Sequence, residues 1–181
     1  MHIKLNQDFM SFYKEIPLFS AGYRKIAALL NSGADLLPPF ILRLILAYEF
    51  WDAGFMKLNS EGWFDQLKFP YPFNLISDDN LWIMSTWLEI AGAIGLLLGL
   101  GTRFFTVALM VLTVVAIQTV HWPIEWHTLT DLSKGFVITD KGFGNFKLPV
   151  MYLAMFMPLL FGGAGRLSMD YVINSYLRKM K

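Results

Sequence analysis

Four ionisable residues lie within one strongly apolar stretch of the sequence, ILRLILAYEFWDAGFMKL. They are Arg43, Glu49, Asp52 and Lys57, and Glu89 occupies the middle of a second apolar stretch further along. If these stretches cross a bilayer, each buried charge costs at least ~2.5 kcal/mol, so each is expected to face the protein interior and to have a partner. Ionisable groups in such a setting are typical of proton-transfer and ligand-binding sites.

The carboxyl groups of this set are the residues that could do acid–base chemistry. Glu49 and Asp52 are three residues apart, which places them on neighbouring parts of one helix face. Glu89 should lie at a similar depth on the next, antiparallel helix, so that acids from two helices would share one pocket. Burial and mutual repulsion both favour the protonated form of a carboxyl group. We therefore predict that at least one of the three acids is protonated at neutral pH and exchanges protons or hydrogen bonds with a ligand.

The same charges also fit a purely structural network. Arg43 would then pair with one of the acids and Asp52 with Lys57, and these ion pairs would hold neighbouring helices together. Gly92, which follows Glu89 by three residues, has a similar double interpretation. A small residue lets two helices pack closely, or it leaves room for a flat ligand beside the acid.

The composition places these residues in a membrane protein. Of the 181 residues, 55% are hydrophobic and 16% are charged, whereas a soluble domain has about 25% charged residues. A helix needs roughly 20 mostly apolar residues to cross a bilayer. Four stretches meet this requirement, and they cover residues 38–58, 80–100, 103–122 and 147–165. The fold class predicted from the sequence is therefore all-α, a polytopic membrane four-helix bundle over residues 38–165.

The distribution of Lys and Arg predicts on which side of the membrane the terminal segments lie. Nine of these residues fall in the N-terminal arm, the 101–103 turn and the C-terminal tail, and five fall in the two long loops. Because cytoplasmic segments carry the excess of positive charge, both termini are predicted to be cytoplasmic. Residues 1–37 are predicted to form a cytoplasmic amphipathic arm, either an interfacial helix on the inner leaflet or a helix docked on the bundle. Residues 166–181 are predicted to be a cytoplasmic basic tail.

His121 and His127, with Glu125 between them, are the residues whose types could bind a metal ion. Imidazole and carboxylate ligands suit copper, zinc or iron, but a spacing of six residues across Pro123 is not a recognised ligand pattern. We therefore expect no metal site. If a metal ion were bound, His121 and His127 would be the candidate ligands. The sequence has no cysteine, which excludes disulfides and thiolate chemistry. The net charge of +1 offers no general attraction for nucleic acid.

Two motifs carry a resemblance to a known family. They are LRLILAYEFWDAGFMKL, with Arg43, Gly54 and Lys57, and LEIAGAIGLLLGLGTRF, with Glu89, Gly92, Gly99, Thr102 and Arg103. On these residues the chain resembles the DoxX family of small four-helix membrane proteins, over about residues 38–165. The resemblance implies a subunit of the bacterial inner membrane that is linked to oxidoreductase systems. An example is the small subunit of thiosulfate:quinone oxidoreductase, for which quinone is the electron acceptor.

The stretch GFGNFKLPVMYLAMFMPLLFGGAGRLSMD is similar to a subgroup of that family encoded beside biosynthetic genes for copper-binding, thioamide-containing peptides. That similarity implies a helper in peptide maturation or in defence against metal stress. The acidic EFWD motif departs from the small, apolar residues expected there in the family. It marks this branch either as specialised or as lacking a direct quinone role.

Together, the residues and the resemblance indicate an integral membrane subunit of a redox system that binds quinone and handles protons within the bundle. The residues assigned to proton transfer are Glu49, Asp52 and Glu89, and those assigned to substrate binding are Arg43, Lys57 and Gly92. The partners implied are membrane lipid and a second protein subunit. The alternatives are a small ion or proton carrier, or a non-catalytic membrane anchor or scaffold whose aromatic outer loops hold a partner.

Overall fold

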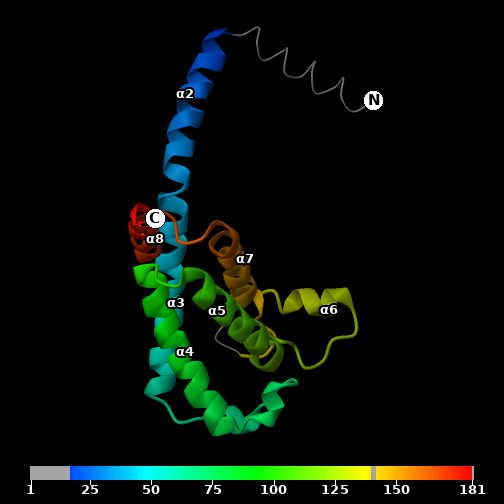
Figure 1. Cartoon of the computed structure of the whole chain (residues 1–181). Coiled ribbons are helices and arrows are strands. Elements are labelled where there is room, and N and C mark those ends of the chain that lie inside the picture. Colours follow the sequence, from blue (N-terminus) through cyan, green and yellow to red (C-terminus); the bar gives the residue numbers. More distant parts are fainter. Residues whose placement is uncertain (1–16, 140–141, 181) are drawn as a thin grey trace. The chain divides into compact units, whose positions relative to one another are not determined.

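The computed structural model describes residues 17–139 and 142–180, and within them the chain is helical with no β-strand (Figure 1). The segment up to Pro38 forms one unit and Pro39–Lys181 forms a second. The α-helices are α2 (Pro17–Ala34), α3 (Leu37–Leu58), α4 (Asp78–Leu98), α5 (Thr102–Ala116), α6 (Leu129–Lys134), α7 (Lys147–Gly162) and α8 (Met169–Lys179). The shorter elements are η1 (Phe64–Gln66) and η2 (Phe73–Leu75) after α3, and η3 (Ile117–His121), a wider helical turn that continues α5.

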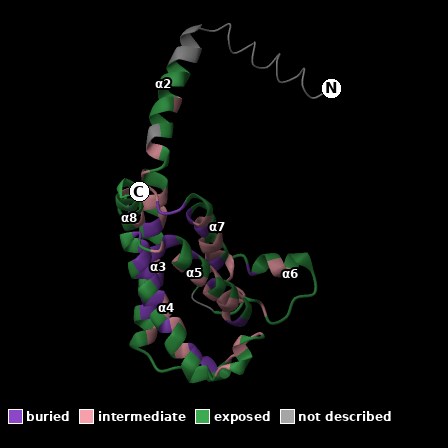
Figure 2. Cartoon of the chain, viewed as in Figure 1, coloured by how far each residue is buried: buried purple, intermediate pink, exposed green. Residues whose placement is uncertain are grey.

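The described side chains of α2, those of residues 22–31, 33 and 34, are mostly exposed (Figure 2). Its exposed large apolar residues are Tyr23, Ile26, Leu29 and Leu30. A helix is thus present in the second half of the predicted arm, whereas residues 1–16 lie outside the described part of the chain. The placement of this arm on the inner leaflet stays a prediction.

α3 has one buried face and one exposed apolar face. It begins at Leu37 with two prolines, which suit the first turn of a helix because the N–H groups there have no intrahelical acceptor. Its 22 residues make it about 33 Å long, which matches the hydrocarbon thickness of a bilayer. The buried residues follow helical spacing and are Arg43, Leu46, Ala47, Phe50 and Gly54.

A tight turn joins α4 to α5 through Gly99 and Gly101, whose φ angles are 65° and 59°. Residues other than glycine rarely adopt this left-handed backbone conformation. A glycine with a positive φ angle commonly ends a helix. The two helices also pack closely, because a Cβ atom at Gly95 would lie only 2.3 Å from Cδ2 of Phe105. The turn and this close approach fix α4 and α5 as an antiparallel hairpin.

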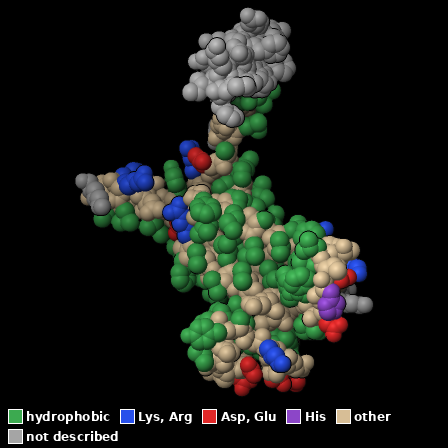
Figure 3. Space-filling view, turned by 90° about the vertical axis from the view of Figure 1, so that its right-hand side faces the viewer, with side chains coloured by type: hydrophobic (Ala, Val, Ile, Leu, Met, Phe, Trp, Pro, Cys, Tyr) green, Lys and Arg blue, Asp and Glu red, His purple; other side chains and the backbone are tan. Residues whose placement is uncertain are grey.

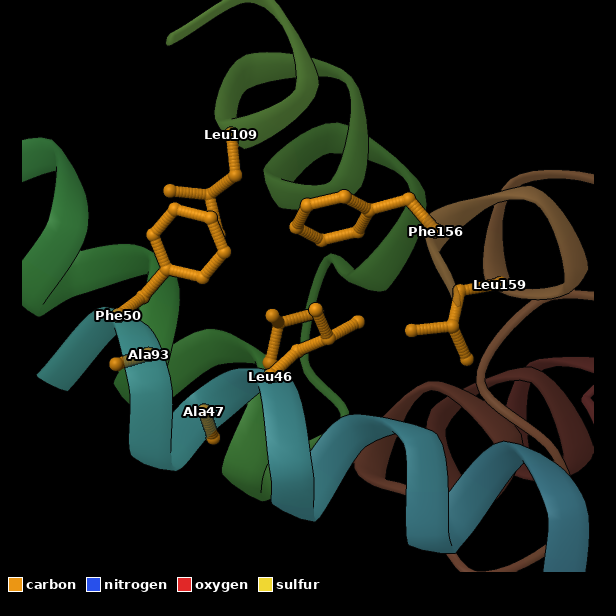
Figure 4. Packing of buried hydrophobic residues seen from close by; sticks show 8 residues of the cluster. Leu46, Ala47, Phe50, Ala93, Leu109, Phe156 and Leu159 are labelled. Atoms are coloured by element: carbon orange, nitrogen blue, oxygen red, sulfur yellow. The ribbon is translucent and has the colours of Figure 1, made fainter. Parts of the chain in front are cut away.

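One hydrophobic core draws on α3, α4, α5 and α7. Figure 4 shows Leu46 and Phe50 of α3 directed toward Leu109 of α5 and Phe156 of α7. The ring centroids of Phe50 and Phe156 lie 5.6 Å apart. Leu46, Leu109 and Phe156 are completely buried, so the four helices share a single packed interior.

Two segments of the described chain are long and apolar enough to cross a membrane, Asp78–Leu98 and Thr102–His121. Lys147–Gly162 is apolar but shorter, and α3 is long enough but carries the charged residues named above. Exposed apolar side chains cover much of the face drawn in Figure 3. The all-helical part of the predicted fold is therefore confirmed for the described residues. The four-span bundle stays a prediction, although all four predicted stretches coincide with helices to within a few residues.

Candidate functional site

The side chains of Lys57 and Glu89 form an ion pair between α3 and α4. Lys57 Nζ lies 2.6 Å from Glu89 Oε1, and the two side chains are 18% and 4% exposed. Gly54, three residues before Lys57, makes this contact possible. A Cβ atom at Gly54 would lie 2.8 Å from Cγ1 of Ile90 and 3.1 Å from Cβ of Glu89, so only glycine allows α3 to approach α4 this closely.

The second carboxylate oxygen of Glu89, Oε2, is buried and has no hydrogen-bond partner among the residues that the structure describes. An unsatisfied buried acceptor costs about 1–3 kcal/mol, and more when it carries charge. The loop after α3 folds back over the ion pair, since Phe64 is buried and Lys57 Nζ lies 5.8 Å from the centroid of its ring. Phe64 in turn packs edge-on against Trp82 of α4. The pair is therefore enclosed on the loop side by aromatic rings.

A second polar contact joins α3 to α7. The Tyr152 hydroxyl donates a hydrogen bond to Glu49 Oε2, and the Tyr152 ring packs against Phe50 with centroids 5.9 Å apart. Asp52, one turn after Glu49, is exposed but close enough to interact electrostatically with Tyr152. Tyr152 is not among the site residues predicted from the sequence. Its one available signal was a hydroxyl group in the middle of an apolar stretch.

Arg43 is 1% exposed and makes its hydrogen bonds with backbone carbonyl groups. Its Nη1 donates to Leu96 O at 3.1 Å, and its Nη2 donates to Leu167 O. The carbonyl groups of the last helical turn have no intrahelical donor, so a guanidinium group is a favourable partner for the end of α4. Gly99 provides the space, because a Cβ atom there would lie 2.2 Å from Arg43 Nη1. Arg43 therefore clamps a helix end.

The predicted acids do not meet in one pocket. Glu89 lies against Gly54, and Glu49 precedes Gly54 by five residues, which is about 7.5 Å along the axis of α3. The structure thus brings Glu89 together with Lys57 and brings Glu49 together with Tyr152. It also differs from the structural network expected from the sequence, because Lys57 pairs with Glu89 and not with Asp52.

Gly92 lies in the packing interface between α4 and α5. A Cβ atom at this position would lie 2.8 Å from Cδ1 and 3.0 Å from Cδ2 of Leu109, and Leu109 is completely buried. Leu109 cannot move aside without disturbing the shared core. In this structure Gly92 therefore allows close packing of α5 on α4.

The two histidines occupy different surroundings. His121 Nδ1 lies 2.6 Å from Asn145 Oδ1, whereas His127 is exposed and lines a shallow pocket together with Glu125 and Asp131. Over residues 17–139 and 142–180, no group of three or more His, Cys, Asp or Glu side chains is placed to hold a metal ion. In this structure the ring of His121 is thus engaged with Asn145, and His127 faces the pocket.

Comparison with known proteins places these elements in a family. The DoxX family model matches residues 39–122, which include α4, α5 and nearly all of α3 but not Tyr152. An uncharacterized protein of Haemophilus influenzae is 35% identical over 147 residues, which is 80% of this chain and 87% of that protein. No solved structure matches the chain. The Lys57–Glu89 pair, the contact of Arg43 with Leu96 and the glycine turn all lie within residues 39–122, and the chain belongs to the DoxX family of membrane proteins.

Proposed function

We propose that the protein is the membrane subunit of a redox system and binds a quinone head group beside the Lys57–Glu89 pair. The observation that carries the proposal is the Oε2 atom of Glu89, which is buried next to a paired ammonium group and has no hydrogen-bond partner in the described part of the chain. A ligand hydroxyl would satisfy this acceptor. When bound, a quinone would supply the redox chemistry by taking up two electrons and two protons, and the quinol so formed carries the hydroxyl group that this acceptor needs.

The residues around this position have distinct roles in the proposal. Lys57 holds the Glu89 carboxylate in one orientation and offers further N–H donors for a ligand carbonyl. Glu89 would hold a proton at Oε2 for delivery to a quinone oxygen, and its carboxylate would then accept a hydrogen bond from the hydroxyl group so formed. The aromatic ring of Phe64 shields the pair from water on the loop side.

The Glu49–Tyr152 contact is the second proton-handling group in the proposal. Glu49 is half-buried and accepts the hydrogen bond of the Tyr152 hydroxyl. A proton held there lies about 7.5 Å along the axis of α3 from the level of Glu89, so bridging waters would have to connect the two groups. Asp52, on the exposed side of the same helix, would pass the proton onward. Arg43 keeps a structural role, because two of its nitrogens are bonded to carbonyl groups.

A four-span topology in the bacterial inner membrane, with both termini cytoplasmic, completes the proposal. It is supported by the single core of α3, α4, α5 and α7 and by the excess of Lys and Arg in the terminal segments and the 101–103 turn. The chain has no cysteine that could ligate an iron–sulfur cluster. We propose that the electron donor belongs to a partner subunit.

A second candidate function is a membrane anchor for that partner, with or without quinone chemistry. The observation that favours it is the exposed face of α3, where Tyr48, Trp51, Asp52 and Phe55 follow one another at helical spacing. A carboxylate exposed to acyl chains is costly. A partner helix with Lys or Arg at the same depth would pair with Asp52 and cover the aromatic rings.

The test is to purify the full chain in mild detergent and measure the quinone that co-extracts. We expect bound quinone in the parent protein and at least tenfold less in Glu89→Gln, since a hydrogen bond to a charged group contributes about 1.5–3 kcal/mol. Glu61→Gln, which changes an exposed loop acid, is the matched control and should retain quinone. Absence of quinone from the parent protein, or equal retention by Glu89→Gln, would contradict the proposal.

The same preparation tests the second candidate. A stoichiometric co-purifying protein that is lost in Asp52→Asn but retained in Glu89→Gln would support the anchor function. If the partner is retained in Asp52→Asn, the exposed face of α3 is not its docking surface.

A further inference from the structure

α8 is an amphipathic helix with a continuous apolar face. Asp170, Asn174 and Arg178 succeed one another at intervals of four residues and form the polar side. The other side has the spacing of a helical apolar stripe. Its residues are Met169, Val172, Ile173, Tyr176, Leu177 and, just beyond the helix, Met180.

The apolar face of α8 does not pack against the rest of the chain as the structure describes it. α8 has no buried residue, and Val172 and Tyr176 are 64% and 65% exposed. In Figure 3 the helix projects sideways from the body, with apolar side chains on its lower side and basic ones above. A contiguous exposed apolar surface marks an interaction site.

The attachment of α8 fixes its level relative to the membrane-capable helices. Asp170 accepts hydrogen bonds from Gly101 N at 2.8 Å and Thr102 N at 2.9 Å, and its own N–H donates to Gly99 O at 2.9 Å. The start of α8 is thus tied to the turn between α4 and α5. Both segments joined by that turn are long and apolar enough to span a bilayer, so the turn lies at a membrane surface. α8 starts at the same surface.

We propose that the apolar face of α8 inserts into the bilayer leaflet at this surface, and that its basic residues bind anionic phospholipid head groups. Arg178 and Lys179 occupy the last turn of the helix, and a helix with an apolar face and a basic polar face is typical of interfacial binding. Their long side chains can reach head-group phosphates while the apolar face stays in the acyl region. This surface is separate from the Lys57–Glu89 pair, and the inference does not depend on quinone binding.

The absence of cysteine from the sequence allows spin labels to be placed at single positions. Val172→Cys and Asn174→Cys lie on opposite sides of α8 and form a matched pair. Each full-length variant would be labelled and reconstituted into phosphatidylcholine vesicles containing phosphatidylglycerol. We expect the label at 172 to be accessible to oxygen and shielded from a water-soluble nickel reagent, and the label at 174 to show the reverse.

Two results of this experiment would overturn the proposal. Equal accessibility of both labels to the nickel reagent would mean that α8 lies in water. Shielding of the label at 172 from both reagents would mean that a protein surface, from a second copy or a partner, covers the face instead of lipid.

The lipid selectivity is tested with the double variant Arg178→Gln/Lys179→Gln in the Val172→Cys background. Each basic residue near an anionic surface should contribute about a fivefold factor to the ratio of membrane-bound to free α8. We expect that ratio to fall accordingly in vesicles with phosphatidylglycerol and to be unchanged in vesicles of phosphatidylcholine alone. Lys68→Gln, in the loop after α3, is the control. An equal ratio in the double variant and the control would refute anionic lipid binding.

Discussion

Lys57 of α3 and Glu89 of α4 lie 2.6 Å apart as a nearly buried ion pair between two helices. Gly54 makes the pair possible by allowing the two backbones to approach, and Phe64 covers the ammonium group. Because the second oxygen of Glu89 has no hydrogen-bond partner within residues 17–139 and 142–180, the pair combines helix packing with a buried hydrogen-bond acceptor. Mutations can separate the role of the pair in helix packing from its role as a hydrogen-bond acceptor.

Removing one member of this pair should destabilise the protein more than removing both. We expect Glu89→Leu to lower the free energy of unfolding by about 3 kcal/mol, because Lys57 is left as an unpaired charge. The double variant Lys57→Met/Glu89→Leu should recover most of this loss. Detergent titration of the helical circular dichroism signal measures both values. If the double variant loses at least as much stability as Glu89→Leu, the two side chains do not stabilise each other.

The turn glycines offer a matched comparison. Gly99→Ala places a Cβ atom 2.2 Å from Arg43 Nη1 at a φ of 65°, whereas Gly101→Ala has a similar φ of 59° and no contact closer than 3.8 Å. The left-handed conformation alone costs about 1–2 kcal/mol, so we expect that loss for Gly101→Ala and a larger one for Gly99→Ala. Equal melting temperatures of the two variants would show that Arg43 does not occupy the space beside Gly99.

Tyr152→Phe tests the hydrogen bond to Glu49. Loss of the hydroxyl should cost about 1 kcal/mol of stability and should shift the infrared carboxylate bands assigned through a Glu49→Gln comparison. Tyr176→Phe removes a hydroxyl from an exposed residue of α8 and should leave both quantities unchanged. Unaltered carboxylate bands in Tyr152→Phe would mean that Glu49 has another donor.

Asp131 should make the stability of α6 depend on pH. Hydrogen bonds from Lys134 and Thr128 lower the pKa of Asp131 from 3.8 to about 2. Since the folded-state pKa is the lower one, its stabilising contribution is complete above about pH 4 and is lost as the pH falls through about 2. We expect amide exchange in α6 to rise over that window, and not in Asp131→Asn. An NMR titration of the Asp131 carboxyl carbon with a midpoint near 4 would rule this out.

The helices themselves could be predicted because their signal is local. Each predicted apolar stretch coincides with a helix to within a few residues, and the prolines at the start of α3 and the glycines after α4 mark ends by their backbone preferences. Pairing could not be predicted in the same way. Lys57 has acids available on both α3 and α4, and the choice of Glu89 depends on helix rotation and on the approach allowed by Gly54.

Two further features needed tertiary information. Arg43 was expected to pair with acidic side chains, but its hydrogen-bond acceptors are the carbonyl groups of residues 96 and 167. Because every residue has a backbone carbonyl group, the sequence cannot indicate which of them accept these bonds. The segment after residue 166 was interpreted by its charge alone as a basic tail. Its apolar residues have helical spacing, and only the structure shows that this face remains uncovered.

The Arg43 clamp also bears on the order of assembly during synthesis. Arg43 lies near the start of the first apolar helix, yet the carbonyl oxygen that receives its Nη2 belongs to a residue 124 positions later. While the ribosome is still translating, the guanidinium group must find temporary partners, such as water or translocon side chains. The hairpin of α4 and α5 can form early. Arg43 of α3 can make its hydrogen bond to Leu167 O only after α7 has emerged. A nascent chain that stops before Leu167 would therefore leave Nη2 of Arg43 without its acceptor among the apolar helices, which is a defect that membrane proteases can recognise.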